Sequence, residues 1–290
     1  MNYLAHFGLR EPPFGITPDT SFFFPCRSAQ QALNTLLVSL NNGEGFIKIT
    51  GEVGTGKTLL CRKFLSTLDE KRWVSAYITN PSLEPRTLLL AFAEEMGSAA
   101  EQGVDQHRLL KALTRTLLDL AAKDKRVVLC LDESQAMPID TLETLRLMTN
   151  LETEKRKLLQ VVLFGQPELD KKLAKESIRQ LRQRISFHHD LHGLDEQEVA
   201  AYFAHRLRVA GYTGAQLLQP AARRLLYRAS RGVPRLVNIL AHKALLLVYG
   251  EGGWSVEKRH MRAALLDTPA ALQPRWWWPW SRTLANRVAK

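Results

Sequence analysis

Residues 51–58 read Gly-Glu-Val-Gly-Thr-Gly-Lys-Thr and fill the pattern G-x-x-x-x-G-K-[ST]. Glycines allow a tight turn in which successive backbone N–H groups face one concavity and bind phosphate oxygens. In such loops the lysine, here Lys57, reaches the β- and γ-phosphates, and the next hydroxyl, here that of Thr58, binds Mg²⁺. The pattern predicts a site for ATP and Mg²⁺ that is built by Gly51, Glu52, Val53, Gly54, Thr55, Gly56, Lys57, Thr58 and Leu59.

The flanking residues favour this interpretation over an ordinary glycine turn. Residues 46–50 form a short β-prone run, and residues 58–65 have helical spacing. A strand, a glycine loop and a helix in this order are the context in which the motif binds phosphate. We therefore expect the chain to bind a nucleoside triphosphate.

A second group of candidate residues ends the apolar run at 126–133, whose last two residues are Asp132 and Glu133. A continuous apolar strand suits a parallel sheet covered on both faces, and ligands collect at the carboxyl ends of such strands. Asp132 can hold the metal through water, and Glu133 can orient and deprotonate the attacking water. Alone, the run could be a buried strand before a solvated acidic turn. With the glycine loop upstream, it predicts ATP hydrolysis.

The elements around these residues indicate an α/β fold. Further strands are expected at 73–79 and 158–164, and a short strand within 181–194. Gln166 follows the strand at 158–164, at its carboxyl end. Helices are expected at 28–40, 85–96, 105–122, 139–150, 196–210, 219–230, 234–249 and 255–266.

Composition excludes several classes of protein. The chain has 290 residues, of which 45% are hydrophobic, as in an ordinary globular protein. The sequence contains no stretch of about 18 uncharged apolar residues, so no membrane-spanning helix is predicted. The N-terminus lacks the basic and then apolar pattern of a secretory signal. Its three cysteines, Cys26, Cys61 and Cys130, are far apart in sequence. We expect these cysteines to be small residues of the core, in a protein of the reducing cytoplasm.

The net positive charge of the chain is concentrated in its carboxyl-terminal third. Residues 195–290 hold 15 Lys and Arg against 6 Asp and Glu, whereas the preceding residues hold 25 against 23. Such a balance predicts contact with a polyanion, either nucleic acid or an anionic membrane surface. A solvated helical face explains it equally well.

Several motifs together resemble AAA+ ATPases over about residues 30–268. They are the glycine loop, the acidic strand at 127–133, the pair Arg182 and Arg184, and the string Arg231-Gly232-Val233-Pro234-Arg235. The order of these motifs is similar to that in RuvB-type motors and in ATPases of the ExeA kind. The opening at residues 7–25, FGLREPPFGITPDTSFFFP, resembles the start of ExeA/GspA secretion ATPases, above all those of MSHA-type pilus biogenesis.

The resemblance implies a P-loop NTPase of the AAA+ class, with a three-layer αβα sandwich around a parallel sheet and an all-helical lid. The expected domains are a lead-in at 1–27, the AAA+ domain at 28–194, the lid at 195–268 and a Trp-rich basic tail at 269–290.

The resemblance also implies roles for residues outside the glycine loop and the acidic strand. Arg184, with Arg182, matches the finger that reaches the γ-phosphate of a neighbouring subunit, which implies a homo-oligomer. Arg235 matches the lid arginine that senses phosphate in cis, and Gln166 matches the polar sensor after the preceding strand. A guanidinium suits the spread charge of a transferred phosphoryl group. The alternatives are an exposed basic edge for the finger pair and helix capping or a surface ion pair for Arg235.

The tail at 274–282, Pro-Arg-Trp-Trp-Trp-Pro-Trp-Ser-Arg, holds four of the six tryptophans. Tryptophans are enriched at membrane interfaces, and nearby basic residues add attraction to anionic lipid. ExeA-like proteins continue after the lid into a membrane span, whereas no such span is predicted within this sequence. The tail predicts docking to an anionic membrane or to an inner-membrane partner, against the alternatives of a disordered end or of tryptophans packed on the lid.

Three functions remain open on sequence alone. The first is an ATPase, peripheral to the cytoplasmic face of the inner membrane, that assists assembly of a type IV pilus or type II secretion machine. The second is a DNA-handling ATPase of the transposition-accessory or RuvB-like type. The third is a nucleotide-gated scaffold that turns over slowly. His188, His189 and His192 do not predict a metal site, because adjacent strand residues point to opposite faces.

Overall fold

The computed structural model describes residues 3–79, 81–97, 105–149 and 157–271. These residues form two compact units. The nucleotide unit comprises residues 27–192, and the helical unit comprises the described residues before 27 and after 192. The chain therefore passes between the units twice, and the lead-in belongs to the helical unit.

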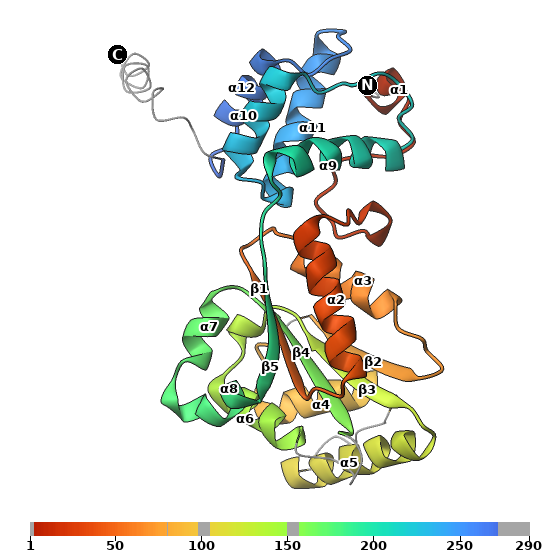
Figure 1. The fold of residues 1–290 in the computed structure, drawn as a ribbon, viewed down its shortest axis with the longest axis vertical. Coiled ribbons are helices and arrows are strands. Elements are labelled where there is room, and N and C mark those ends of the chain that lie inside the picture. The colour runs from red at the N-terminus through yellow and green to blue at the C-terminus, as the bar shows by residue number, and fades with distance from the viewer. Residues whose placement is uncertain (1–2, 80, 98–104, 150–156, 272–290) are drawn as a thin grey trace. The chain divides into compact units, whose positions relative to one another are not determined.

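A five-stranded parallel sheet forms the centre of the nucleotide unit, with the strand order β2-β3-β4-β1-β5 (Figure 1). The strands are β1 Phe46–Gly51, β2 Trp73–Ile78, β3 Arg126–Leu131, β4 Leu159–Gly165 and β5 Ile185–Leu191. Parallel strands need crossover helices, which cover both faces of the sheet. This explains why β4 is buried along its whole length and β3 at every position after Arg126.

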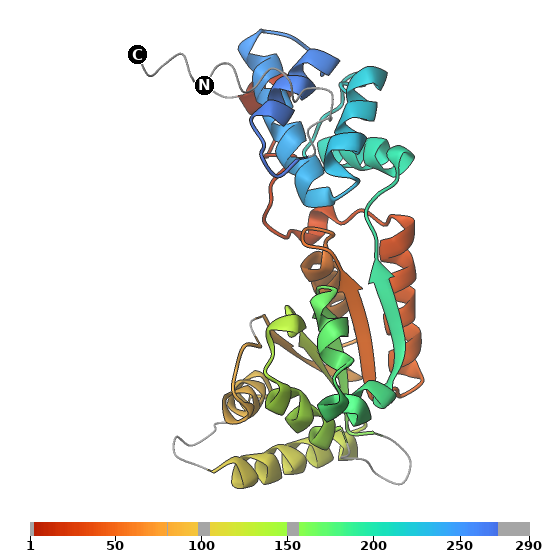
Figure 2. The same cartoon turned by 90° about the vertical axis from the view of Figure 1, so that its left-hand side faces the viewer.

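The helices of this unit lie on both faces. They are α2 Arg27–Asn41, α3 Lys57–Ser66, α4 Pro85–Glu95, α5 Gln106–Ala122, α6 Ile139–Met148, α7 Glu168–Leu173 and α8 Arg179–Arg184, with short 3₁₀ turns η2 Ser134–Ala136 and η3 Glu176–Ile178. Val127, Leu129 and Leu131 of β3 share a core with α4, α5 and α6. Val128 and Cys130 are buried on the opposite face, and Figure 2 shows α2 running beside β5. The three-layer αβα sandwich expected from the sequence is confirmed.

The helical unit contains the short α1 Tyr3–Phe7, η1 Thr20–Phe22, α9 Glu196–Val209, α10 Pro220–Ser230, α11 Pro234–Gly250 and α12 Lys258–Leu266. The sequence marks several of these helix starts. Asp195 and Glu198 form a capping box before α9, and prolines occupy the first position of α10 and α11. Within the described ranges, no helix has both the length and the hydropathy needed to cross a membrane.

The lead-in is an integral part of the helical core. The rings of Phe7, Phe14 and Phe22 are buried among residues of α9 to α12. Arg206 of α9, itself buried, donates hydrogen bonds to the carbonyl oxygens of Pro13 and Gly15 at 2.5 and 3.1 Å. Its guanidinium carbon lies 4.2 Å from the centre of the Phe22 ring. Arg206 thus provides hydrogen-bond donors for two backbone carbonyls of a segment that has little regular structure of its own.

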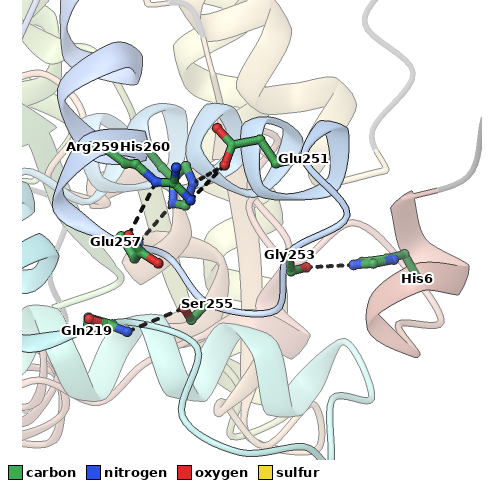
Figure 3. A network of polar contacts seen from close by, with 8 residues as sticks. All are labelled: His6, Gln219, Glu251, Gly253, Ser255, Glu257, Arg259 and His260. Atoms are coloured by element: carbon green, nitrogen blue, oxygen red, sulfur yellow. Dashed lines mark hydrogen bonds and ion pairs between the residues drawn. The ribbon is translucent and has the colours of Figure 1, made fainter.

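A network of polar contacts surrounds the loop that follows α11 (Figure 3). The ring of His6 in α1 hydrogen-bonds to the carbonyl oxygen of Gly253 at 2.8 Å and stacks on Trp254. Nearby, Glu251 accepts from Arg259 and pairs with the buried His260 at 3.0 Å. These contacts tie α1 and α12 to the loop that follows α11.

Candidate nucleotide-binding site

The loop between β1 and α3 has the backbone that phosphate binding requires. Gly54 and Gly56 have φ values of 83° and 99°, a region that other residues rarely adopt. A Cβ atom on Gly51 would lie 2.8 Å from the Leu191 carbonyl oxygen and 2.9 Å from the Thr55 hydroxyl. Thr55 in turn donates to the Glu52 carbonyl at 2.8 Å, which closes the turn. The loop therefore fits a triphosphate, and a side chain at Gly51 or Gly56 would oppose that fit.

Lys57 lies inside this concavity. Its side chain is buried, and the ammonium donates to the carbonyl oxygens of Gly51 and Glu52 at 2.8 and 3.0 Å. Burial lowers the pKa of Lys57, and the negative charges of Glu133 and Asp132 offset part of that effect. The loop carbonyls hold the charged amine where phosphate oxygens would compete for it.

Thr58 and Asp132 supply oxygen atoms suited to Mg²⁺. The Thr58 hydroxyl donates to Oδ2 of Asp132 at 2.6 Å, and the Tyr77 hydroxyl donates to the same oxygen at 3.3 Å. The other carboxylate oxygen of Asp132 accepts the backbone N–H of Glu133 at 2.9 Å. Hydroxyl and carboxylate oxygens together are the ligands that Mg²⁺ prefers. This pair fits the ion at the expected place.

Glu133 lies at the carboxyl end of β3 with φ at 53°, in the left-handed region that is uncommon for residues other than glycine. Its Oε2 accepts hydrogen bonds from the side-chain amides of Gln135 and Gln166, at 2.5 and 3.0 Å. Burial raises the pKa of Glu133, but these two bonds and the charge of Lys57 outweigh burial, so the pKa is lowered. A strained backbone that is held by neighbours is typical of functional sites.

The structure brings Gln166 to Glu133, across 33 positions of sequence. Gln135, which sequence reasoning did not single out, joins them. The only available signal was its place two residues after Glu133, in the turn where β3 ends.

Arg182 and Arg184 do not join this cluster. They end α8 directly before β5, and Arg182 is exposed while Arg184 is half-buried. In the sheet, Phe46 pairs with Ile185 and Gly51 pairs with Leu191. Since a strand rises by about 3.3 Å per residue, Arg184 lies roughly 20 Å from the phosphate loop of its own chain, at the opposite end of the sheet.

Arg235 is exposed in the first turn of α11, in the helical unit. The preceding turn is tight, because Arg231 and Gly232 have φ values of 51° and 73°. A Cβ atom on Gly232 would lie 1.8 Å from the Leu194 carbonyl oxygen. The turn thus fixes where α11 begins. The Trp-rich segment at 274–282 lies outside the described residues.

Comparison with known proteins agrees with this site. Residues 40–173 match the family model described as an AAA domain, a range that contains the phosphate loop, Asp132, Glu133 and Gln166. The chain contains an AAA ATPase domain.

One curated relative matches most of the chain. The chain is 41% identical over 254 residues to General secretion pathway protein A of Aeromonas hydrophila. The match covers 88% of this chain and 46% of that protein, so the chain spans about half the length of this relative.

Two solved structures show the same fold. ORC2 of Aeropyrum pernix, in ADPNP and ADP complexes, matches with a TM-score of 0.65 and 18% identity, over 85% of this chain and 68% of that one. RuvB of Thermotoga maritima matches with a TM-score of 0.58 and 15% identity, over 87% of this chain and 73% of that one. Both likenesses show that the chain shares this fold, including the region that continues into helices.

Proposed function

We propose that this chain is an AAA+ ATPase of the ExeA/GspA secretion family, which hydrolyses Mg-ATP to assist assembly of a type IV pilus or type II secretion machine. The observation that carries this proposal is the 41% identity to General secretion pathway protein A, which covers 88% of the chain and so extends beyond the nucleotide unit into the helical unit. The opening at residues 7–25 favours a role like that of MshM in MSHA-type pilus biogenesis.

The residues around the loop have distinct roles in this reaction. The backbone N–H groups of residues 51–59 and the ammonium of Lys57 bind the phosphates, after the amine exchanges loop carbonyls for phosphate oxygens. Thr58 and Asp132 would hold Mg²⁺, which would supply positive charge against the phosphates. Glu133 orients a water against the γ-phosphorus and accepts its proton as the bond to ADP breaks. Gln166 fixes the Glu133 carboxylate.

Three arginines complete the site from elsewhere. The distance of Arg184 from the phosphate loop of its own chain supports action on a neighbouring subunit, with Arg182 beside it. Hydrolysis then requires a homo-oligomer. Arg235, fixed at the start of α11, senses the phosphate in cis.

The place of action follows from the proposed family. The ATPase works at the cytoplasmic face of the inner membrane and binds inner-membrane proteins of the pilus or secretion machine. The Trp-rich segment contributes docking to anionic lipid, since indoles and arginines favour that interface.

A capture experiment tests this function. Glu133→Gln, held in Mg-ATP, is used to isolate bound proteins and DNA from cells that express the pilus or secretion genes, with Lys57→Ala as the control that lacks ATP. Enrichment of inner-membrane assembly proteins on Glu133→Gln alone supports the proposal. Enrichment of DNA, with duplex binding that falls steeply as salt rises, would replace it with a DNA-handling ATPase. Equal ATP turnover by Glu133→Gln and wild type would leave a nucleotide-gated scaffold.

A further inference from the structure

Both the nitrogen and the oxygen of the Gln135 side-chain amide form hydrogen bonds. The nitrogen donates to Oε2 of Glu133 at 2.5 Å, and the oxygen accepts the backbone N–H of Gln166 at 3.0 Å. A carboxylate only accepts and a backbone N–H only donates, so these two partners fix which way the amide points. Gln135 therefore links the carboxyl end of β3 to that of β4, directly beside Glu133.

The Glu133 carboxylate is held on one side. Gln135 and Gln166 both donate to Oε2. Among the contacts of the described residues, Oε1 of Glu133 has no hydrogen-bond partner in the protein. Two donors on one oxygen set the plane of the carboxylate and leave the other oxygen to accept a proton from water.

The turn that carries Gln135 is itself fixed. The ammonium of Lys172 in α7 donates to the backbone carbonyls of Gln135 and Met137. The buried Ser134 hydroxyl donates to the Leu131 carbonyl at 2.9 Å. A Cβ atom on Gly165 would lie 3.3 Å from the Gln135 amide oxygen and 2.8 Å from the Leu169 side chain, so the glycine leaves room for both side chains beside β4.

We propose that Gln135 is a positioning residue for hydrolysis, which presents Glu133 to the attacking water together with Gln166, while Lys172 holds its backbone from behind. This inference rests on the proposed ATPase function. In this role Gln135 acts through Glu133 and needs no contact of its own with the nucleotide.

Three methionine substitutions test it. Gln135→Met keeps the length of the side chain and removes both hydrogen bonds. Its kcat is expected to fall about 10- to 100-fold, as for other residues that orient a reacting group, while the Kd for a fluorescent ATP analogue stays within about twofold. Lys172→Met is expected to show the same split with a smaller loss. Gln30→Met, at an exposed position in α2, is the matched control and should leave kcat and Kd unchanged.

The double variant tests whether the two residues act as a unit. If Lys172 works through Gln135, adding Lys172→Met to Gln135→Met lowers kcat by less than the product of the single losses. Wild-type kcat in Gln135→Met, or a parallel loss of kcat and ATP affinity, would overturn the inference. A merely structural role would produce the parallel loss.

A readout without turnover separates this inference from the proposed function. In ¹⁵N-labelled protein, the side-chain NH₂ signal of Gln135 is the pair that Gln135→Met lacks. The contact predicts that this signal shifts in Glu133→Ala, and an unmoved signal would refute the contact. A wild-type protein that hydrolyses no ATP would sink the proposed function, whereas active wild type with active Gln135→Met would sink the positioning role alone.

Discussion

The Thr58 hydroxyl donates a hydrogen bond of 2.6 Å to Oδ2 of Asp132, across 74 positions of sequence. Thr58 is in the first turn of α3, and Asp132 directly follows β3. The packing of α3 on the sheet therefore places a hydroxyl beside a carboxylate at the mouth of the phosphate loop. Both are oxygen ligands of the type that Mg²⁺ selects.

Thr58→Val is expected to lose the part of ATP affinity that depends on Mg²⁺, because the methyl group cannot bind the ion. Loss of one charge-assisted contact of about 1.5–3 kcal/mol corresponds to at least about a tenfold change in affinity. Titration with ATP in excess Mg²⁺ and in excess chelator measures the difference. Thr58→Ser, which keeps the hydroxyl, should retain it. Equal Mg²⁺ dependence in Thr58→Val and wild type would exclude Thr58 as a ligand.

Arg184→Ala is expected to bind ATP normally but to hydrolyse it about 10³-fold more slowly, because arginine fingers supply about 10³–10⁵ in rate. A mixing experiment identifies the subunit on which the arginine acts. Arg184→Ala has an intact phosphate loop and Glu133, whereas Glu133→Gln has an intact Arg184. An equal mixture should recover about a quarter of wild-type activity, the share of interfaces at which random assembly combines both intact groups.

The control for this experiment is Arg179→Ala, on the same helix, whose exposed side chain pairs with Glu176 at 3.2 Å. It should hydrolyse ATP at the wild-type rate. A mixture as inactive as its components would mean that Arg184 does not act across subunits.

Gly232→Ala is expected to destabilise the helical unit by about 3 kcal/mol or more, because the new methyl group meets the Leu194 backbone and φ is 73°. The comparison is Gly250→Ala at the end of α11, where a Cβ atom would meet nothing within 4 Å. That change should stay within about 1 kcal/mol. Denaturant unfolding measures both, and similar losses would show that the turn before α11 is not constrained.

Stability should depend on pH through Asp190. The Thr50 hydroxyl donates to Asp190 and is the main cause of its lowered pKa. A carboxyl group whose pKa is lowered by folding stabilises the native state above its ordinary value of 3.8, and this contribution is lost as the pH falls through the folded value. Thr50→Val should therefore cost about 1 kcal/mol at neutral pH and progressively less below about pH 4.

The control for the pH experiment is Asp190→Asn, which keeps a hydrogen-bond acceptor for Thr50 and removes the titrating group. In that background the cost of Thr50→Val should not vary with pH. A constant cost in the wild-type background as well would show that the bond does not sense the charge of Asp190.

Long elements with strong signals could be predicted from the sequence. The strands at β3 and β4 are continuous apolar runs, and α5 and α9 have an aspartate cap at the start. The helices α7 and α8 were not predicted, since each has six residues and no full amphipathic period. Tertiary burial of Leu169, Leu173 and Leu181 stabilises them instead.

The candidate site also contains some residues that the sequence predicts and others that it does not. Lys57 and Thr58 belong to one local pattern, so the sequence predicts their place directly. The contact of Glu133 with Gln166 depends on the pairing of β3 with β4, and the resemblance to a family gave Gln166 a sensor role without predicting this contact. Gln135 was missed because a glutamine in a turn carries no chemical signal until its partners are known. The same holds for Arg206, whose carbonyl partners in the lead-in lie more than 190 positions away.

The helical unit has a core assembled from both sides of another domain. Phe7, Phe14 and Phe22 are synthesised before any residue of the nucleotide unit, but the helices that bury them are synthesised after it. These three aromatic rings therefore cannot reach their final places in the core until about 170 further residues have been synthesised. Synthesis proceeds at roughly 5–20 residues per second. During those seconds the nascent chain offers chaperones an apolar segment that the finished protein hides.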